Sequence, residues 1–201
     1  MVASLRAHDL VRVDPNIAHR WPEAAPWVAQ SLRGAPWVVV RREGADGVVP
    51  IGVRGARRSE RFAATIAFGD VRQSMSPYDL DGRVDSNGRL SGVFSVLKQF
   101  AQRLGLRIAP IGSFGFEIAS GVRVTHETSD LDVLVDAAGI AREALHAFAG
   151  EIEARSASSG VRIDAELAYN DGAAALAEVV SGNRLVLFKT SSGPRLLPCP
   201  V

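Results

Sequence analysis

Residues 69–92 form a stretch of the sequence without a clear hydrophobic period. This stretch collects Gly, Ser, Asp and Asn around Pro77, residue types that favour turns over helices and strands. We therefore place a domain boundary there. The sequence predicts an N-terminal α+β module over residues 1–80, which binds substrate or partner, and a catalytic domain over residues 81–201.

Short apolar runs dominate the part before this boundary. Runs of four to seven residues rich in Val, Ile and Phe are typical of strands, and we expect strands at 10–13, 37–41, 48–53 and 62–68. An Ala-rich segment at 23–32 predicts a helix. Together these elements indicate a small α+β module.

The hydrophobic period changes after the boundary. Leu90, Phe94, Leu97, Ala101 and Leu104 recur at steps of three and four, which is the stripe of an amphipathic helix. Further on we expect helices that open at Gly112 and Gly139, and strands at 106–111, 130–135, 161–167 and 185–190. The fold class predicted for the whole chain is α+β, a mixed sheet with helices on one or both faces.

Composition excludes several classes of protein. Hydrophobic residues are 47% of the 201 and the formal net charge is +1, so disorder and broad binding to nucleic acid are not expected. A single cysteine rules out an intrachain disulfide and a Cys-rich zinc site. No stretch approaches the roughly 20 apolar residues of a membrane span, and the first residues do not resemble a signal peptide. We expect a cytoplasmic protein.

Two aspartates at the start of a predicted strand are the first candidate site residues. Asp130 and Asp132 are two positions apart, so on a strand they point to the same face. Carboxylates so close together repel each other and raise each other's pKa unless a cation lies between them. Mg²⁺ suits such a pair, because it prefers oxygen ligands and shares its remaining positions with substrate phosphates.

Two further segments could complete this site. Gly112 and Ser113 follow a predicted strand and open a helix, where glycine lets the backbone approach closely, serine can cap, and free N–H groups favour a phosphate. Asp164 lies inside a predicted apolar strand, where an unpaired carboxylate is costly. It is the candidate third carboxylate, and Glu166 shares its face.

These residues carry a resemblance to a known family. The Gly-Ser pair, the Asp-x-Asp strand and the later Asp resemble the nucleotidyltransferase superfamily with the DNA polymerase β-like fold. The longer run GSFGFEIASGVRVTHETSDLDVLV, with PIGVRG, HDLVRV and FKT elsewhere, is similar to the malonate decarboxylase holo-acyl-carrier-protein synthases. These enzymes (MdcG) are also called phosphoribosyl-dephospho-CoA transferases.

The resemblance implies a reaction and its participants. It implies transfer of a 2'-(5''-phosphoribosyl)-3'-dephospho-CoA group from its triphosphoribosyl precursor to a serine of the acyl-carrier subunit of malonate decarboxylase, with release of diphosphate. Asp130, Asp132 and Asp164 would hold Mg²⁺, and Asp164 could instead orient or deprotonate the attacking hydroxyl. Gly112 and Ser113 would hold the phosphates.

Other charged residues admit two interpretations each. Lys189 could reach the triphosphate or could be an exposed lysine at a strand end. The basic cluster of Arg54, Arg57, Arg58 and Arg61 could recruit an acidic carrier subunit, bind substrate phosphates, or be a solvated face. The pair His8-Asp9 could be a catalytic dyad, although a polar entry to a strand is the simpler interpretation.

Two other functions stay open on the sequence. A nucleotidyltransferase that moves a nucleotide from an NTP to a small molecule or protein would use the same carboxylates. A non-catalytic nucleic-acid-binding module could use the arginine cluster, but the near-zero net charge argues against it. The nucleotide that the protein consumes would separate the two enzymes.

Overall fold

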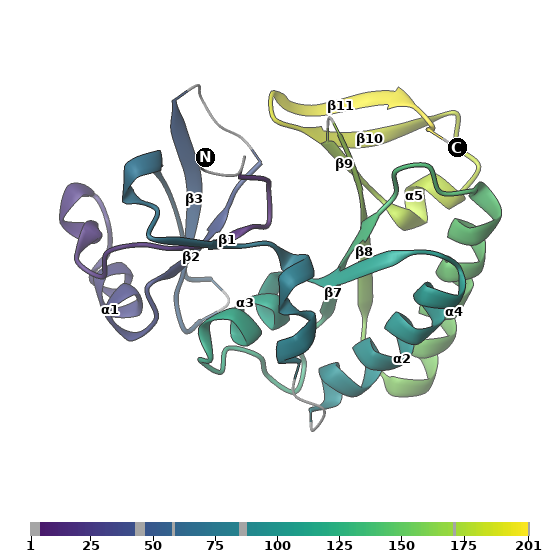
Figure 1. Ribbon diagram of the computed structural model, residues 1–201, viewed down its shortest axis with the longest axis horizontal. Coiled ribbons are helices and arrows are strands. Elements are labelled where there is room, and N and C mark those ends of the chain that lie inside the picture. Colours follow the sequence, from purple (N-terminus) through teal and green to yellow (C-terminus); the bar gives the residue numbers. More distant parts are fainter. Residues whose placement is uncertain (1–4, 43–46, 58, 85–87, 171, 201) are drawn as a thin grey trace.

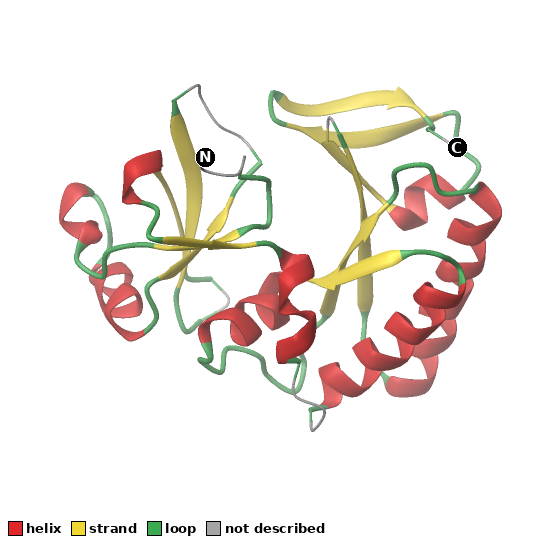
Figure 2. Ribbon diagram, viewed as in Figure 1, coloured by secondary structure: helices red, strands yellow, loops and turns green. Residues whose placement is uncertain are grey.

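The computed structural model describes residues 5–42, 47–57, 59–84, 88–170 and 172–200, and it confirms the α+β fold class. Strands form two separate sheets, one from each part of the chain (Figures 1 and 2). Among the described residues no helix is both long enough and apolar enough to cross a membrane.

Within the described residues, the N-terminal sheet has five antiparallel strands in the order β4-β3-β2-β1-β5. Alternate residues of β3, Val49, Ile51 and Val53, are buried and pack in one core with helix α1. The elements of this part are β1 (Leu10–Arg12), η1 (Ile17–Arg20), α1 (Pro26–Gly34), β2 (Trp37–Val40), β3 (Val48–Arg54), β4 (Arg61–Ala67), η2 (Phe68–Asp70) and β5 (Gln73–Met75).

In the described part of the chain, the C-terminal sheet has six strands in the order β11-β10-β9-β8-β7-β6. Strands β7 and β8 run parallel, and the other described pairs are antiparallel. The elements are η3 (Pro77–Arg83), α2 (Arg89–Arg103), β6 (Arg107–Pro110), α3 (Gly112–Ser120), β7 (Leu131–Asp136), α4 (Arg142–Ser159), β8 (Ile163–Tyr169), β9 (Gly172–Ala175), α5 (Leu176–Val180), β10 (Leu185–Thr190) and β11 (Gly193–Pro198).

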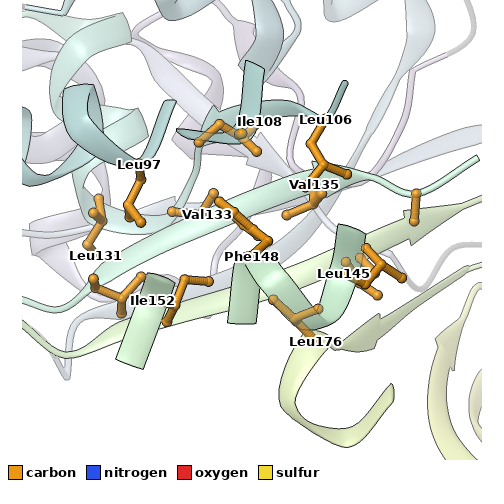
Figure 3. Close-up of a cluster of buried hydrophobic side chains, with 14 of the residues drawn as sticks. Leu97, Leu106, Ile108, Leu131, Val133, Val135, Leu145, Phe148, Ile152 and Leu176 are labelled. Atoms are coloured by element: carbon orange, nitrogen blue, oxygen red, sulfur yellow. The ribbon is translucent and has the colours of Figure 1, made fainter. Parts of the chain in front are cut away.

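Helices α2 and α4 cover one face of this second sheet (Figure 2). Leu131, Val133 and Val135 of β7 point to that face and pack with Leu97 of α2 and Phe148 of α4 (Figure 3). Because side chains alternate along a strand, Asp132 of β7 points to the opposite face. The core thus fixes which side of the sheet carries the carboxylates.

The two sheets meet at helix α3. One cluster of buried side chains joins Leu10 and Trp37 of the first sheet to Leu80 of η3 and Phe116 of α3. Helix α3 lies at this junction in Figure 1, and its first residue is Gly112. The packing between the two parts therefore also positions the start of α3.

Most predicted elements are present, with bounds shifted by a few residues. Helix α4 begins at Arg142, three residues after the predicted opening at Gly139, and continues to Ser159. The interrupted stretch at 69–92 is more ordered than predicted, because β5 pairs with β1 and Pro77–Arg83 forms a 3-10 helix. Strands β9 and β11 and helix α5 were not predicted. The domain division at residue 80 stays a prediction.

Candidate active site

Two of the predicted aspartates lie side by side on neighbouring parallel strands. Asp132 of β7 is directly in register with Asp164 of β8, and both point away from helices α2 and α4. Asp130 lies one residue before β7. The side chain of Asp164 is 49% exposed and forms an ion pair with Arg162 at 3.0 Å, so solvent can reach it.

The surroundings of Asp132 disfavour its negative charge. Burial raises the pKa of this carboxyl, and the nearby charges of Asp164 and Asp130 raise it further. His8 and Arg162 act in the opposite direction but do not outweigh these effects. A cation bound between Asp132 and Asp164 would relieve the repulsion.

Gly112 packs directly against the Asp132 carboxylate. Its φ angle is +62°, and a Cβ atom at this position would lie 1.9 Å from Asp132 Oδ2. The backbone N–H of the preceding Ile111 donates to the Asp132 carbonyl at 3.0 Å. Only glycine combines this conformation with so close an approach, and the turn therefore holds the carboxylate in place.

Ser113 does not cap helix α3, contrary to one sequence expectation. The helix already begins at Gly112, and its N-cap residue, Ile111, makes no side-chain hydrogen bond to the first turn. Ser113 lies inside that turn, so its hydroxyl is not at the capping position. The N–H groups at the start of α3 are left without a side-chain cap.

A cavity of about 790 Å³, the carboxylate cavity, contains this site. Its lining includes Asp132, Asp164, Glu166 and Lys189, together with apolar residues of α4 and α5 and with His146 and Glu153 of α4. The ammonium group of Lys189 donates to Glu166 Oε2 at 2.8 Å. The structure thus brings two of the three predicted metal-binding aspartates, Asp132 and Asp164, and the predicted phosphate-binding Lys189 into one cavity, whose described lining does not include Asp130.

Glu166 is the centre of a charged network that crosses between the two sheets. Its Oε1 lies 3.0 Å from His8 Nε2 and also accepts from Arg42. Its side chain is only 12% exposed. Burial by itself would raise the pKa of Glu166, but the contacts with His8, Lys189 and Arg42 outweigh it and lower the pKa to about 2. Glu166 is therefore ionised at neutral pH.

The donor set at Asp132 and Asp164 fits a hard divalent cation. In the described ranges no group of three or more His, Cys, Asp or Glu side chains is gathered closely enough to hold a metal ion. Mg²⁺ commonly binds proteins through only one or two carboxylates, with waters and substrate phosphates as the other ligands. The full set of Asp130, Asp132 and Asp164 as metal ligands stays a prediction.

Comparison with known proteins gives the family. Residues 74–200 match the phosphoribosyl-dephospho-CoA transferase MdcG C-terminal domain, and residues 6–77 match the MdcG N-terminal domain. The chain belongs to the MdcG family. It is therefore a transferase, as the resemblance in its sequence implied.

Relatives match over nearly the whole of this MdcG-family chain. A phosphoribosyl-dephospho-CoA transferase of Pseudomonas putida (strain GB-1) is 36% identical over 197 residues, which cover 97% of this chain and 94% of the relative. Another, of Klebsiella pneumoniae subsp. pneumoniae, is 35% identical and covers 100% of this chain and 98% of the relative. No solved structure gives a significant match.

The described residues of the predicted basic cluster lie outside the carboxylate cavity of this MdcG-family chain. Arg54 and Arg61 form the last pair of the β3–β4 hairpin, and Arg57 lies in its turn, where its N–H donates to Glu60. Arg58 is outside the described residues. None of the described cluster residues lines the carboxylate cavity, so a role of this cluster stays a prediction.

Sequence reasoning missed two residues at the site of this MdcG-family chain. The interpretation of His8 as a polar strand entry overlooked its contact with Glu166, and Arg42 was not considered. Both contacts join residues more than a hundred positions apart, at separations of 158 and 124. No local pattern indicates them, although the shared face of Asp164 and Glu166 was a partial signal.

Proposed function

We propose that the protein transfers a 2'-(5''-phosphoribosyl)-3'-dephospho-CoA group from its triphosphoribosyl precursor to a serine of the acyl-carrier subunit of malonate decarboxylase. Membership of the MdcG family supports this reaction. The observation that carries the proposal is the register of Asp132 with Asp164 beside the Gly112 turn. Such a pair suits phosphoryl transfer because it can hold a cation against substrate phosphates.

In the proposed reaction the serine Oγ attacks the first phosphorus of the triphosphate. A bond forms between Oγ and this phosphorus, the bond from the same phosphorus to the bridging oxygen breaks, and diphosphate leaves with that oxygen. The serine proton passes to water. The side chain of Asp164 is 49% exposed, so this side of the site is accessible to water and to a hydroxyl that arrives on another protein.

The other side chains bind and orient the phosphates. Asp132 and Asp164, with Asp130, would hold Mg²⁺, which supplies positive charge to the phosphate oxygens. Lys189 reaches into the same cavity and would bind the two phosphates that leave. The N–H groups at the start of α3, a helix of nine residues, would approach the substrate phosphates from the Gly112 side.

The decisive experiment measures the intact mass of the carrier subunit after incubation. Purified apo-carrier is mixed with this protein, Mg²⁺ and the triphosphoribosyl precursor, and in parallel with ATP in place of the precursor. We expect the mass of one phosphoribosyl-dephospho-CoA group to be added, with release of one diphosphate, only with the precursor. A carrier whose acceptor serine is replaced by alanine should gain no mass.

The alternative enzyme gives a different result in the same experiment. An adduct of AMP on a protein or small molecule, formed from ATP and not from the precursor, would overturn the proposal and favour a general nucleotidyltransferase. An unmodified carrier under both conditions would also contradict it.

A further inference from the structure

A second cavity, of about 630 Å³, lies between the two parts of the chain. We call it the interdomain cavity, because β3 and the segment before β1 line it on one side and the ends of β7 and β8 line it on the other. Among its described lining residues the basic side chains outnumber the acidic ones. The basic residues are Arg6, His8, Arg41 and Arg42, and the acidic ones are Asp9 and Asp136. The cavity therefore favours an anionic ligand.

The two cavities share a wall. Glu166 and Lys189 line the carboxylate cavity, and His8 and Arg42 line the interdomain cavity. These four side chains form one network, in which Arg42 Nη2 also lies 3.1 Å from His8 Nε2. The basic groups of His8, Arg42 and Lys189 surround the Glu166 carboxylate. These are more basic groups than one buried negative charge needs for compensation. A ligand long enough to pass this wall could occupy both cavities.

His8 is held at this wall in an uncommon backbone conformation. Its φ angle is +74°, and it is the one non-glycine residue with positive φ in the described part of the chain. The segment is fixed by hydrogen bonds from the His8 N–H to the Val40 carbonyl at 2.9 Å and from the Val40 N–H to the Asp9 carbonyl at 2.7 Å. Backbone strain of this kind concentrates at functional sites.

Tyr78 adds an unsatisfied donor beside the interdomain cavity. The residue lines the cavity, and its buried hydroxyl has no hydrogen-bond partner among the described residues. Burial, with the charge of Asp136, raises the pKa of Tyr78 to about 12, so the hydroxyl keeps its proton. An oxygen-rich ligand is the kind of partner that such a donor lacks.

We propose that the interdomain cavity binds the diphosphate that joins adenosine to pantetheine in the dephospho-CoA part of the substrate. This inference rests on the proposed function. The triphosphoribosyl precursor carries two separate phosphate groups, and the two adjoining cavities offer a cationic site for each. Lys189, with a cation that Asp132 and Asp164 would hold, would bind the triphosphate, and Arg42 and His8 would bind the diphosphate. An ordinary NTP has only one such group, so the second cavity selects for the dephospho-CoA moiety.

The test is calorimetric titration of dephospho-CoA, which lacks the triphosphoribosyl group, into the intact protein. We expect Arg42→Gln to raise the Kd at least about tenfold, since an arginine–phosphate contact is a charge-assisted hydrogen bond. His8→Asn should do the same, and asparagine tolerates the left-handed conformation of this residue. Arg33→Gln, which removes an exposed charge of α1 that lines neither cavity, should bind like wild type.

Further arms locate the ligand and separate this inference from the proposed function. Asp132→Asn should leave dephospho-CoA binding unchanged, because that residue lines only the carboxylate cavity. Unchanged Kd in folded Arg42→Gln and His8→Asn, or an equal loss in Arg33→Gln, would overturn the inference while leaving the transfer reaction untouched. Loss of binding in Asp132→Asn alone would place the ligand in the other cavity. Failure of carrier modification with arginine-dependent binding intact would instead reject the function.

Discussion

At the scale of single residues, the position of the Asp132 carboxylate depends on the absence of a side chain at Gly112. We expect Gly112→Ala to lower the rate of carrier modification about 100-fold, since a displacement of about 1 Å at a reacting centre has effects of that size. The added methyl group would lie 1.9 Å from Asp132 Oδ2 in the present geometry, so the carboxylate must move. Steady-state kinetics of the purified variant measure this loss.

Gly160 provides a matched control for this substitution. It also has a left-handed φ angle, +65°, but nothing lies within 4 Å of where its Cβ would be. Gly160→Ala should lower the free energy of unfolding by about 1–2 kcal/mol, because the new Cβ disfavours the left-handed conformation. Since the Cβ contacts nothing, this variant should retain its activity. Equal activity losses in the two variants would show that backbone strain, and not contact with Asp132, is responsible.

At the scale of elements, hydrogen bonds to Glu117 stabilise the segment between α3 and β7. Its Oε2 accepts hydrogen bonds from the N–H groups of Val124 and Thr125, at 2.9 and 2.8 Å, and from the Thr125 hydroxyl at 2.7 Å. This segment leads directly to Asp130. Glu117→Gln should lower the free energy of unfolding by about 1 kcal/mol at pH 7, which is below the usual range for hydrogen bonds to charged groups because Glu117 is partly exposed.

The effect of Glu117 should depend on pH with a defined sign. Burial would raise the pKa of this carboxyl, but the hydrogen bonds from Thr125 and Val124 outweigh it and lower the pKa below its ordinary value of 4.5. A folded-state pKa below the unfolded one gives stability that is present above pH 4.5 and lost as the pH falls further. Urea unfolding at several pH values should show wild type and variant converging in acid, and a constant difference would contradict this account.

Elements that carry a hydrophobic stripe or a distinctive run of residues of their own could be predicted from sequence, whereas exposed or very short elements could not. The stripe from Leu90 to Leu104 gave helix α2 almost at its observed bounds of Arg89–Arg103. Strand β11 was missed because most of its residues are exposed, and two of its six are prolines. Strand β5 has three residues and exists through its pairing with β1, which is a tertiary effect.

At the scale of the whole molecule, a shared apolar cluster links the stability of the two parts. Leu80 is fully buried where η3, α3 and the first sheet meet, and Leu80→Ala should cost about 3 kcal/mol. All three tryptophans, Trp21, Trp27 and Trp37, lie in the N-terminal part. Their fluorescence therefore reports on that part and, through Trp37, on the shared cluster, whereas far-ultraviolet circular dichroism reports on the whole chain.

We expect the two signals to have the same unfolding midpoint in wild type, and Leu80→Ala to lower both together. Leu97→Ala, a substitution in the C-terminal core, should also shift the tryptophan midpoint if the parts unfold as one unit. Separate midpoints, or a Leu97→Ala shift confined to circular dichroism, would show independent unfolding.

The candidate site could be predicted only where its residues share an element or a motif. Asp130 and Asp132 are close in sequence, and Asp164 was indicated by the cost of a carboxylate within an apolar strand. The contacts of Glu166 with His8 and Arg42 depend on how the N-terminal part packs against the second sheet. No periodicity encodes that packing.

The central claim is that Asp132 and Asp164 are held in register to bind a divalent cation. Binding of Mn²⁺, as a spectroscopic probe for Mg²⁺, can be measured by electron paramagnetic resonance with and without inorganic triphosphate. We expect Asp132→Asn and Asp164→Asn to weaken binding at least about tenfold, and Glu143→Gln, an exposed acidic residue of α4, to bind like wild type. Undiminished Mn²⁺ binding in both aspartate variants would contradict the account.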